Sequence, residues 1–393
     1  MPHALCVFFS HRNFLLRRIA LKKNVLGRTG LEVTELSLGT LILGRIQANL
    51  SIEDGAKPVA RAMELGINLI DTAASYGSQP HVREGLKGFL GEVLITTKSH
   101  GRTREAVQKD FETSLKELGR DYIDIYQLHL VNNTKEMEER RDVVNFLLEL
   151  KQQKLIRAIG ASVHRVEGAK AVAAEKDIDI LFPVLNSHGL GIIDGTIDEM
   201  IAVCRQAKER GMGIMAMKPL GGGHLRKSPR ESFDFLRGLG FVDTICVGMK
   251  TPAEVDMNVL TIEGRPVPQE ILTRIETTQR KLKIYDRCLG CGSCVEECAQ
   301  GALSLDLSKP DPAKGKKGVA VVDNHLCILC GYCAEACPTE AIVLEHDFAL
   351  GVYDRWDAII TREELLQPHE PPYVVVRDDK VWKAAEHAWQ VRI

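Results

Sequence analysis

The chain has 393 residues, of which 45% are hydrophobic and 26% are charged, and its formal net charge at pH 7 is -2. A chain of this length exceeds what one hydrophobic core usually serves, so we expect one large domain and a smaller one. The balanced charge gives no electrostatic footprint for nucleic acid, and no apolar run approaches the roughly 18 residues that cross a bilayer. Composition therefore favours small-molecule chemistry over nucleic-acid binding or a membrane span.

The first 23 residues form a basic leader of unknown role. Residues 1–31 contain no acidic side chain, and the stretch "FFSHRNFLLRRIALKK" alternates large apolar residues with arginine and lysine. A surface anchor or a transit segment has this composition. We favour the simpler interpretation, an unstructured start in front of the first domain.

A repeating pattern of strand and helix follows from residue 34 to residue 262. Apolar, strand-like runs recur about every 30 residues and alternate with segments of helical periodicity, several of which end in glycine. The eight predicted strands are residues 35–40, 67–72, 92–98, 122–129, 155–162, 179–185, 213–218 and 242–248. Eight such units predict a closed (β/α)8 barrel with its helices outside. An open doubly wound sheet is the alternative, but the first predicted strand lacks the GxGxxG signature that usually marks one.

Three predicted strands end in an ionisable residue, and a tyrosine follows one of them. Asp71, Lys98 and His129 close three consecutive strands, and Tyr76 lies in the loop after Asp71. Taken singly, each could be structural, but strand ends of a barrel converge on one face, where four such groups can form an acid–base site. A lysine ammonium beside a tyrosine lowers the phenol pKa from about 10, so we expect Lys98 to make Tyr76 a better acid–base group.

The segments "VLGRTGLEVTELSLGT", "NLIDTAASYG", "LITTKSH" and "DYIDIYQLHL" resemble the aldo/keto reductase family. The resemblance runs from Val25 to Asn258. It implies a nicotinamide cofactor, NADH or NADPH, bound across the barrel rim, a small carbonyl or alcohol substrate, and Asp71, Tyr76, Lys98 and His129 as the catalytic tetrad. Tyr76 would protonate the carbonyl oxygen while His129 orients the carbonyl.

The same resemblance gives candidate cofactor contacts, several of them altered. Ser162 matches a residue that contacts the nicotinamide amide, although Val163 replaces the asparagine that usually follows. Met217 stands in place of a ring-stacking tyrosine, and Glu254 replaces the usual arginine for a 2'-phosphate, which puts NADPH preference in doubt. The remaining predicted contacts are Gly248, Lys250, Thr251 and Asn258. The glycine loop at 221–223 could approach a pyrophosphate through its backbone amides.

Eight of the eleven cysteines fall in two runs with identical spacing. Cys288, Cys291, Cys294 and Cys298 are repeated 39 residues later as Cys327, Cys330, Cys333 and Cys337, which indicates an internal duplication. Zinc is the competing metal, but zinc sites usually draw two cysteines from each of two separated knuckles. The spacing matches the two-cluster ferredoxin run, in which the fourth cysteine ligates the other cluster. We therefore predict two 4Fe-4S clusters, one on Cys288, Cys291, Cys294 and Cys337 and the other on Cys327, Cys330, Cys333 and Cys298.

These patterns divide the chain into five parts. They are a leader (1–23), a barrel (24–265), a helical connector (266–284), a small α+β ferredoxin-like domain with short hairpins (285–346) and an extension without an assigned role (347–393). The cysteine spacing is not that of a secreted disulfide framework, so we expect a reducing, cytoplasmic setting.

The function predicted from the sequence is that of an oxidoreductase that interconverts a carbonyl and an alcohol. The clusters either carry single electrons, with a redox protein as a candidate partner, or support the fold. A flavin normally connects two-electron and one-electron carriers, and we find no motif for one. The alternative is an electron-transfer or docking protein whose barrel no longer catalyses carbonyl reduction. The altered cofactor positions Val163, Met217 and Glu254 favour this alternative.

Overall fold

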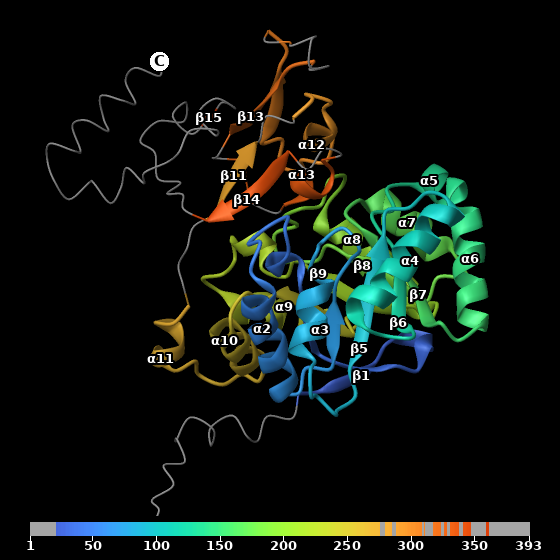
Figure 1. Ribbon diagram of the computed structural model, residues 1–393, viewed down its shortest axis with the longest axis vertical. Helices are drawn as coiled ribbons and strands as arrows, with labels where there is room; N and C mark the ends of the chain where they lie inside the picture. The colour runs from blue at the N-terminus through green and yellow to red at the C-terminus, as the bar shows by residue number, and fades with distance from the viewer. Residues whose placement is uncertain are drawn as a thin grey trace, which may run out of the picture.

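The computed structural model describes residues 21–275, 280–284, 288–308, 310, 317–323, 326–327, 331–337, 341–346 and 359–360. They form a barrel with a smaller module against one of its ends (Figure 1). Most of the predicted leader and of the predicted C-terminal extension lie outside the described residues. Within the described part, no helix is both long enough and apolar enough to span a membrane.

Eight parallel strands close the barrel, as the sequence predicts. Their order around the barrel is β10-β3-β4-β5-β6-β7-β8-β9, and every strand is paired in register with two neighbours. These strands are almost wholly buried, because the barrel interior covers one face and the helices the other. The bounds are β3 (Leu36–Gly39), β4 (Leu69–Asp71), β5 (Leu94–Ser99), β6 (Ile123–Leu128), β7 (Ile156–Val163), β8 (Ile180–Pro183), β9 (Gly213–Met217) and β10 (Thr244–Gly248).

The helices around the barrel begin and end at local signals in the sequence. Thr103 caps the start of α4 by accepting a hydrogen bond from the Ala106 amide, and Gly119 ends that helix in the left-handed conformation. The helices are α2 (Ile52–Glu64), α3 (Gln79–Gly85), α4 (Arg104–Leu118), α5 (Thr134–Glu139), α6 (Arg141–Gln152), α7 (Val166–Ala174), α8 (Ile197–Glu209), α9 (Pro229–Gly238), α10 (Pro252–Ile262) and α11 (Gln269–Leu272), with 3-10 turns η1 (Gly27–Thr29), η2 (Leu41–Leu43) and η3 (Gly221–Gly223).

A hairpin that the sequence reading did not predict covers the other end of the barrel, where the strands begin. It consists of β1 (Lys23–Val25) and β2 (Glu32–Thr34), which pair antiparallel. The turn lies so close to the start of β9 that a Cβ on Gly27 would stand 2.1 Å from the Gly213 amide nitrogen. The hairpin therefore needs glycine at that position.

The described residues of the module form two small sheets and two short helices. Strand β11 (Arg280–Ile284) pairs with β14 (Ile342–His346), and β13 (Val319–Asp323) lies between β12 (Leu303–Asp306) and β15 (Ile359–Ile360). Helices α12 (Ser293–Glu296) and α13 (Tyr332–Glu335) follow equivalent cysteine positions of the two runs. The antiparallel pair of β12 and β13 agrees with the short hairpins expected for this domain.

The predicted helical connector is wrong in its second half. Among its described residues only Gln269–Leu272 is helical, and residues 280–284 form strand β11 of the module. The sequence "RKLKI" alternates basic and apolar residues, a period of two that favours a strand once a partner is available. That partner, β14, follows about 60 residues later in the chain, so local periodicity gave no sign of the pairing.

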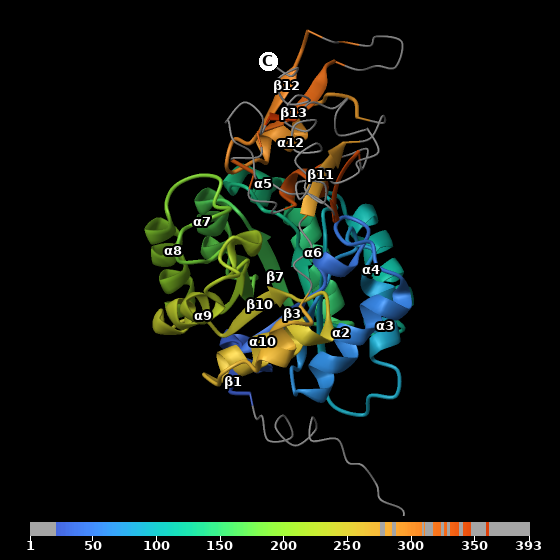
Figure 2. The same cartoon turned by 90° about the vertical axis from the view of Figure 1, so that its left-hand side faces the viewer.

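The module sits on the end of the barrel where the parallel strands finish (Figures 1 and 2). Tyr332 of α13 is 2% exposed and packs within the hydrophobic core of the barrel. Its ring stacks on His164, which follows β7, with the ring centroids 3.5 Å apart. The module therefore covers the face of the barrel that the sequence marks as the site of chemistry.

Candidate functional site

The structure brings the four predicted catalytic residues to one cavity. Asp71 ends β4, Tyr76 lies in the loop after it, Lys98 is in β5, and His129 follows β6. The Lys98 ammonium donates hydrogen bonds to Asp71 Oδ1 at 2.6 Å and to the Thr72 carbonyl at 2.7 Å. All four side chains line a cavity of about 170 Å³ at the strand ends. This arrangement can hold a carbonyl oxygen between an acid and a hydrogen-bond donor.

The electrostatics of Tyr76 differ from the expectation. Burial raises the pKa of Tyr76 well above 10, and the carboxyl groups of Glu335 and Asp71 raise it further. Lys98 Nζ lies over the face of the Tyr76 ring, 4.9 Å from its centre. The expected lowering of the Tyr76 pKa by Lys98 is therefore not what the structure gives. A phenol with a raised pKa keeps its proton at neutral pH and can act as a donor.

The imidazole of His129 is held neutral. Its side chain is 2% exposed, and burial, followed by the neighbouring His100 and Lys98, lowers its pKa well below 6.5. The ring of His100 stacks on it with centroids 3.8 Å apart, and burial lowers the pKa of His100 to about 4. A neutral imidazole orients a carbonyl by donating a hydrogen bond.

The Asp71–Lys98 pair is similarly buried. Burial raises the pKa of the Asp71 carboxyl, and the ion pair and hydrogen bond to Lys98 oppose that rise. Their side chains expose 7% and 2% of their surface. Removing either partner would leave the other charge buried without compensation, which is costly.

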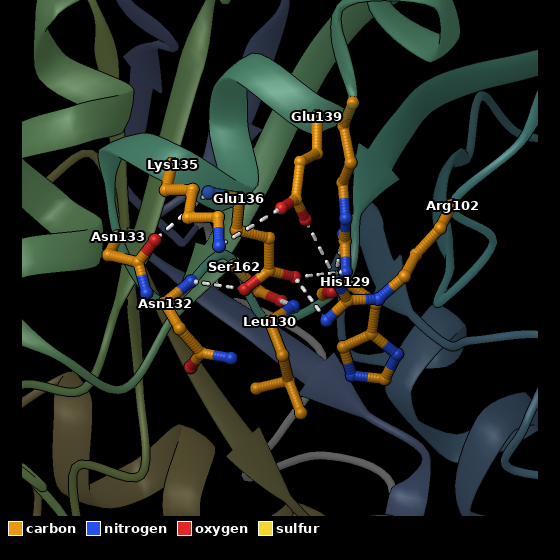
Figure 3. A network of polar contacts seen from close by, with 10 residues as sticks. Arg102, His129, Leu130, Asn132, Asn133, Lys135, Glu136, Glu139 and Ser162 are labelled. Carbon is orange, nitrogen blue, oxygen red and sulfur yellow. Dashed lines mark hydrogen bonds and ion pairs between the residues drawn. The ribbon is translucent and has the colours of Figure 1, made fainter.

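A polar network fixes the backbone on which His129 and Ser162 sit (Figure 3). Arg140 donates to the His129 carbonyl at 2.9 Å and pairs with Glu136, whose other oxygen accepts from the Asn132 amide at 3.1 Å. Leu130, next to His129, has a left-handed φ of 55°. Its amide donates to Ser162 Oγ at 3.0 Å, and this hydrogen bond helps to hold the strained turn.

The predicted cofactor contacts divide into two groups. Ser162, Met217 and Gly248 line the same cavity as the tetrad, and so do Gly222 and Gly223 of the glycine loop. These predicted contacts therefore lie around one cavity together with the tetrad. A Cβ on Gly223 would meet no atom within 4 Å, so the loop also leaves open space beside the cavity.

The other group lies at the start of α10, outside the lining of that cavity. Glu254 Oε2 accepts hydrogen bonds from the Lys250 and Thr251 amides, while Thr251 Oγ1 accepts from the Glu254 amide at 3.2 Å. This capping box places a carboxylate where a helix N-terminus would otherwise attract an anion. Asn258 donates to the Glu254 carbonyl at 2.8 Å, and its Oδ1 is buried without a hydrogen-bond partner.

Sequence reasoning missed three residues that line the cavity, His164, Lys218 and Glu335, and Tyr332, which packs against the first two. His164 and Lys218 follow β7 and β9, while Tyr332 and Glu335 come from the module. Lys218 Nζ stands 3.0 Å from the centre of the Tyr332 ring, a cation–π contact. His164 and Lys218 stand at or just after the ends of predicted strands, as Asp71, Lys98 and His129 do. This position could have identified both as candidate site residues from the sequence.

Glu335 is the one described residue of the module that lines the catalytic cavity. Its side chain is 2% exposed, and its Oε2 stands 3.7 Å from His129 Nε2. Burial raises the pKa of the Glu335 carboxyl, although Lys218 and Lys98 oppose the rise. No local pattern distinguishes Glu335 from its counterpart in the first cysteine run, so the sequence alone could not have found it.

The described cysteines of the first predicted cluster are grouped in space. The pKa of Cys294 is raised to about 12, by burial first and then by the nearby thiols of Cys288, Cys337 and Cys291. Cys337, from the second run, thus lies near Cys294 of the first, as the predicted crossed ligation requires, and the ligation itself stays a prediction. Cys330, a predicted ligand of the other cluster, lies outside the described residues. Among the described residues, no group of three or more His, Cys, Asp or Glu side chains is arranged to hold a single metal ion.

Residues 35–261 match the family model for the aldo/keto reductase family, and this match spans more than half of the chain. The chain belongs to the aldo/keto reductase family. Residues 287–341 match a second family model, the 4Fe-4S dicluster domain. The chain is thus an oxidoreductase barrel followed by an iron–sulfur domain.

Known relatives agree with this family membership. The chain is 23% identical to L-galactose dehydrogenase of Arabidopsis thaliana over 66% of this chain and 94% of that protein. It is 30% identical to the aldo-keto reductase YhdN of Bacillus subtilis over 40% of this chain and 52% of that protein. A crystal structure described as an aldo-keto reductase from Pseudomonas aeruginosa superposes with a TM-score of 0.53 and 28% identity, over 62% of this chain and 94% of that one.

Proposed function

We propose that this aldo/keto reductase interconverts a small carbonyl compound and its alcohol with a nicotinamide cofactor, using Tyr76, Lys98, Asp71 and His129. The observation that carries the proposal is the convergence of these four side chains on one cavity, with Lys98 paired to Asp71. A bound reduced nicotinamide supplies the hydride that reaches the carbonyl carbon. The protein must then supply one proton to the carbonyl oxygen, and the buried Tyr76 hydroxyl is the candidate donor.

The other three residues support Tyr76 in this proposal. Neutral His129 donates a hydrogen bond to the carbonyl oxygen and fixes its direction. The Lys98 ammonium stabilises the negative charge that develops on Tyr76 as its proton leaves, and Asp71 holds that ammonium in place. The residues around the nicotinamide end fit this role, because Ser162, Met217 and Gly248 line the same cavity.

We propose NADH as the preferred cofactor. The carboxylate of Glu254 already satisfies the amides at the start of α10, so it would repel a 2'-phosphate placed there. NADH carries a hydroxyl group in place of that phosphate and would avoid the repulsion.

We also propose that the module binds two 4Fe-4S clusters. The grouping of Cys294 with Cys288, Cys291 and Cys337 fits one four-thiolate site. The apolar cluster that contains Cys288, Cys294 and Cys333 also contains Ala73 and Tyr76 of the barrel, which favours an electron-transfer role beside the structural one. When bound, such clusters exchange one electron at a time.

Replacement of Tyr76 by phenylalanine tests the catalytic proposal. We expect NADH-dependent reduction of an aldehyde panel by the cluster-loaded protein to fall by roughly a hundredfold or more, the usual contribution of a positioned acid. Tyr122→Phe is the matched control, because Tyr122 is 38% exposed on the barrel surface. Full activity of Tyr76→Phe would refute tetrad catalysis. A wild-type protein that reduces no carbonyl compound would favour the docking or electron-transfer alternative.

A further inference from the structure

Glu335 belongs to the iron–sulfur module by sequence but to the barrel's catalytic cavity by position. We propose that Glu335 is a substrate-binding residue, and that the substrate is a compact hydroxy-carbonyl compound or diol whose second hydroxyl donates a hydrogen bond to the Glu335 carboxyl group. This inference rests on the proposed function, because it names the substrate class of the same site. It assigns part of the substrate specificity to the module.

The first support is that the Glu335 carboxyl group is buried in the wall of the catalytic cavity and contacts His129 there. Its side chain is 2% exposed, and its 3.7 Å separation from His129 Nε2 exceeds hydrogen-bonding distance. Because His129 is neutral and too distant for a hydrogen bond, this contact compensates the buried carboxyl group poorly, and a ligand that donates a hydrogen bond inside the cavity would compensate it better. The Glu335 carboxylate would accept a hydrogen bond from a ligand hydroxyl group or from another N–H or O–H donor.

The second support is the composition of the cavity around Glu335. His164, which also lines the cavity, is 3% exposed and has an Nδ1 without a partner, and Tyr76 and His129 stand on the same wall as Glu335. A ligand that fills this space contacts polar groups at several points, so more than one oxygen atom on the ligand would strengthen its binding. This argues against a purely apolar aldehyde.

The third support is the size of the cavity. Its volume of about 170 Å³ is below the usual range for drug-sized ligands, and the nicotinamide ring proposed to enter the same cavity would take part of that space. The space beside that ring favours a compact substrate of a few carbon atoms. The reacting carbon would lie between Tyr76 and His129, and a neighbouring hydroxyl would then reach Glu335.

The internal duplication supplies a matched control. Glu296 is the counterpart of Glu335, 39 residues earlier, at the same place in α12 that Glu335 occupies in α13. Glu296 is exposed, and its backbone carbonyl, at 3.4 Å from Arg165, is its described hydrogen-bonding contact with the barrel. A change at Glu296 alters the charge of the module equally but leaves the cavity intact.

The test measures binding of two probes that differ by one hydroxyl group. Ligand-observed NMR on the cluster-loaded protein gives dissociation constants for 1,2-propanediol and 1-propanol. We expect the wild type and Glu296→Leu to bind the diol at least about tenfold more tightly, and Glu335→Leu to lose this preference. Glu335→Gln keeps a weaker, neutral acceptor, so its preference should fall several-fold while its shape is retained. The second variant decides the matter if Glu335→Leu does not keep its clusters.

Equal binding of the two probes by the wild type, or an unchanged preference in both Glu335 variants, would overturn the inference. Turnover separates it from the proposed function. If wild type and Glu335→Leu reduced glyceraldehyde and propanal at the same ratio of rates, tetrad catalysis would be retained and the role of Glu335 in substrate binding would be refuted. A diol preference that depends on Glu335, without any carbonyl reduction, would remove the catalytic proposal and leave the binding site.

Discussion

The barrel buries a continuous set of leucine, isoleucine and valine side chains, whereas the small core around the module includes the thiols of Cys288, Cys294 and Cys333. A barrel core of that kind supplies most of its stability through apolar burial. A module with short strands and four-residue helices has little apolar surface to bury, so we expect the proposed clusters to supply much of its stability. The two regions therefore fold for different reasons, although their side chains meet at one cavity.

Loss of a cluster should separate the two regions most strongly. We expect Cys294→Ser to lose the iron of one cluster and to make the module sensitive to protease, while the thermal transition of the barrel stays in place. The reason is that the proposed cluster, bound by the four grouped thiolates, would hold this part of the module together. Iron analysis, electron paramagnetic resonance and limited proteolysis with mass spectrometry measure the three effects.

The crossed ligand set provides the control for that experiment. Cys337→Ser should remove the same cluster as Cys294→Ser, and Cys298→Ser should remove the other one. If Cys337→Ser and Cys298→Ser gave the same spectrum, each run would ligate its own cluster and the predicted crossing would be wrong.

Truncation of Tyr332 should weaken the docking of the module on the barrel. Tyr332→Ala deletes a ring that stacks on His164 and packs in the barrel core, and comparable aromatic truncations cost about 3–5 kcal/mol. Tyr332→Phe should keep that stability, because the hydroxyl it removes is buried without a partner. Calorimetry of the cluster-loaded variants measures the difference.

Ser293→Ala is the matched control for Tyr332, because Ser293 holds the equivalent place in α12. It should leave the thermal transition unchanged. A transition for Tyr332→Ala equal to that of wild type would show that the stacking contact contributes nothing to docking.

Acidification should destabilise the barrel through His100. Burial and nearby positive charges, Arg140 first, lower the pKa of His100 from 6.5 to about 4, so the unfolded chain takes up its proton first as the pH falls. Stability from this group is complete above pH 6.5 and is lost between about pH 6.5 and 4. Urea unfolding at pH 7 and pH 5 should show a drop about 2 kcal/mol larger in wild type than in His100→Gln. Equal drops would place the pH dependence elsewhere.

The smallest expected effect is a change in cofactor preference after substitution of Glu254. Glu254→Gln removes the carboxylate from the start of α10, and we expect the ratio of kcat/KM for NADPH to that for NADH to rise several-fold. Glu199→Gln is the matched control, because Glu199 completes the same kind of capping box on α8. An unchanged ratio in Glu254→Gln would mean that the adenosine end of the cofactor does not lie near α10.

Much of the barrel could be predicted from sequence because its signals are local. Each strand run and each glycine stop lies within one unit, and the tetrad residues stand at strand ends that the barrel topology brings together. The hairpin β1–β2 gave too short a pattern to recognise. Strand β11 was read as helix because its partner β14 lies far along the chain.

The module's part in the site could not be predicted, because sequence alone does not say which copy of the duplication faces the barrel. Glu296 and Glu335 stand at the same place in their cysteine runs, yet one is exposed and the other lines the cavity. The predicted direction of the Tyr76 pKa shift is wrong for the same reason. It depends on burial under the module and on Glu335, neither of which local spacing reveals.

The central claim is that the module lies over the catalytic cavity, and tyrosine acetylation tests it most directly. The cluster-loaded protein would be treated anaerobically with N-acetylimidazole and the modified tyrosines identified by mass spectrometry. Tyr122 is 38% exposed, whereas Tyr76 and Tyr332 are 5% and 2% exposed. We predict acetylation of Tyr122 while Tyr76 and Tyr332 stay protected. Acetylation of Tyr76 and Tyr332 as fast as Tyr122 would place the module away from the barrel and contradict the account.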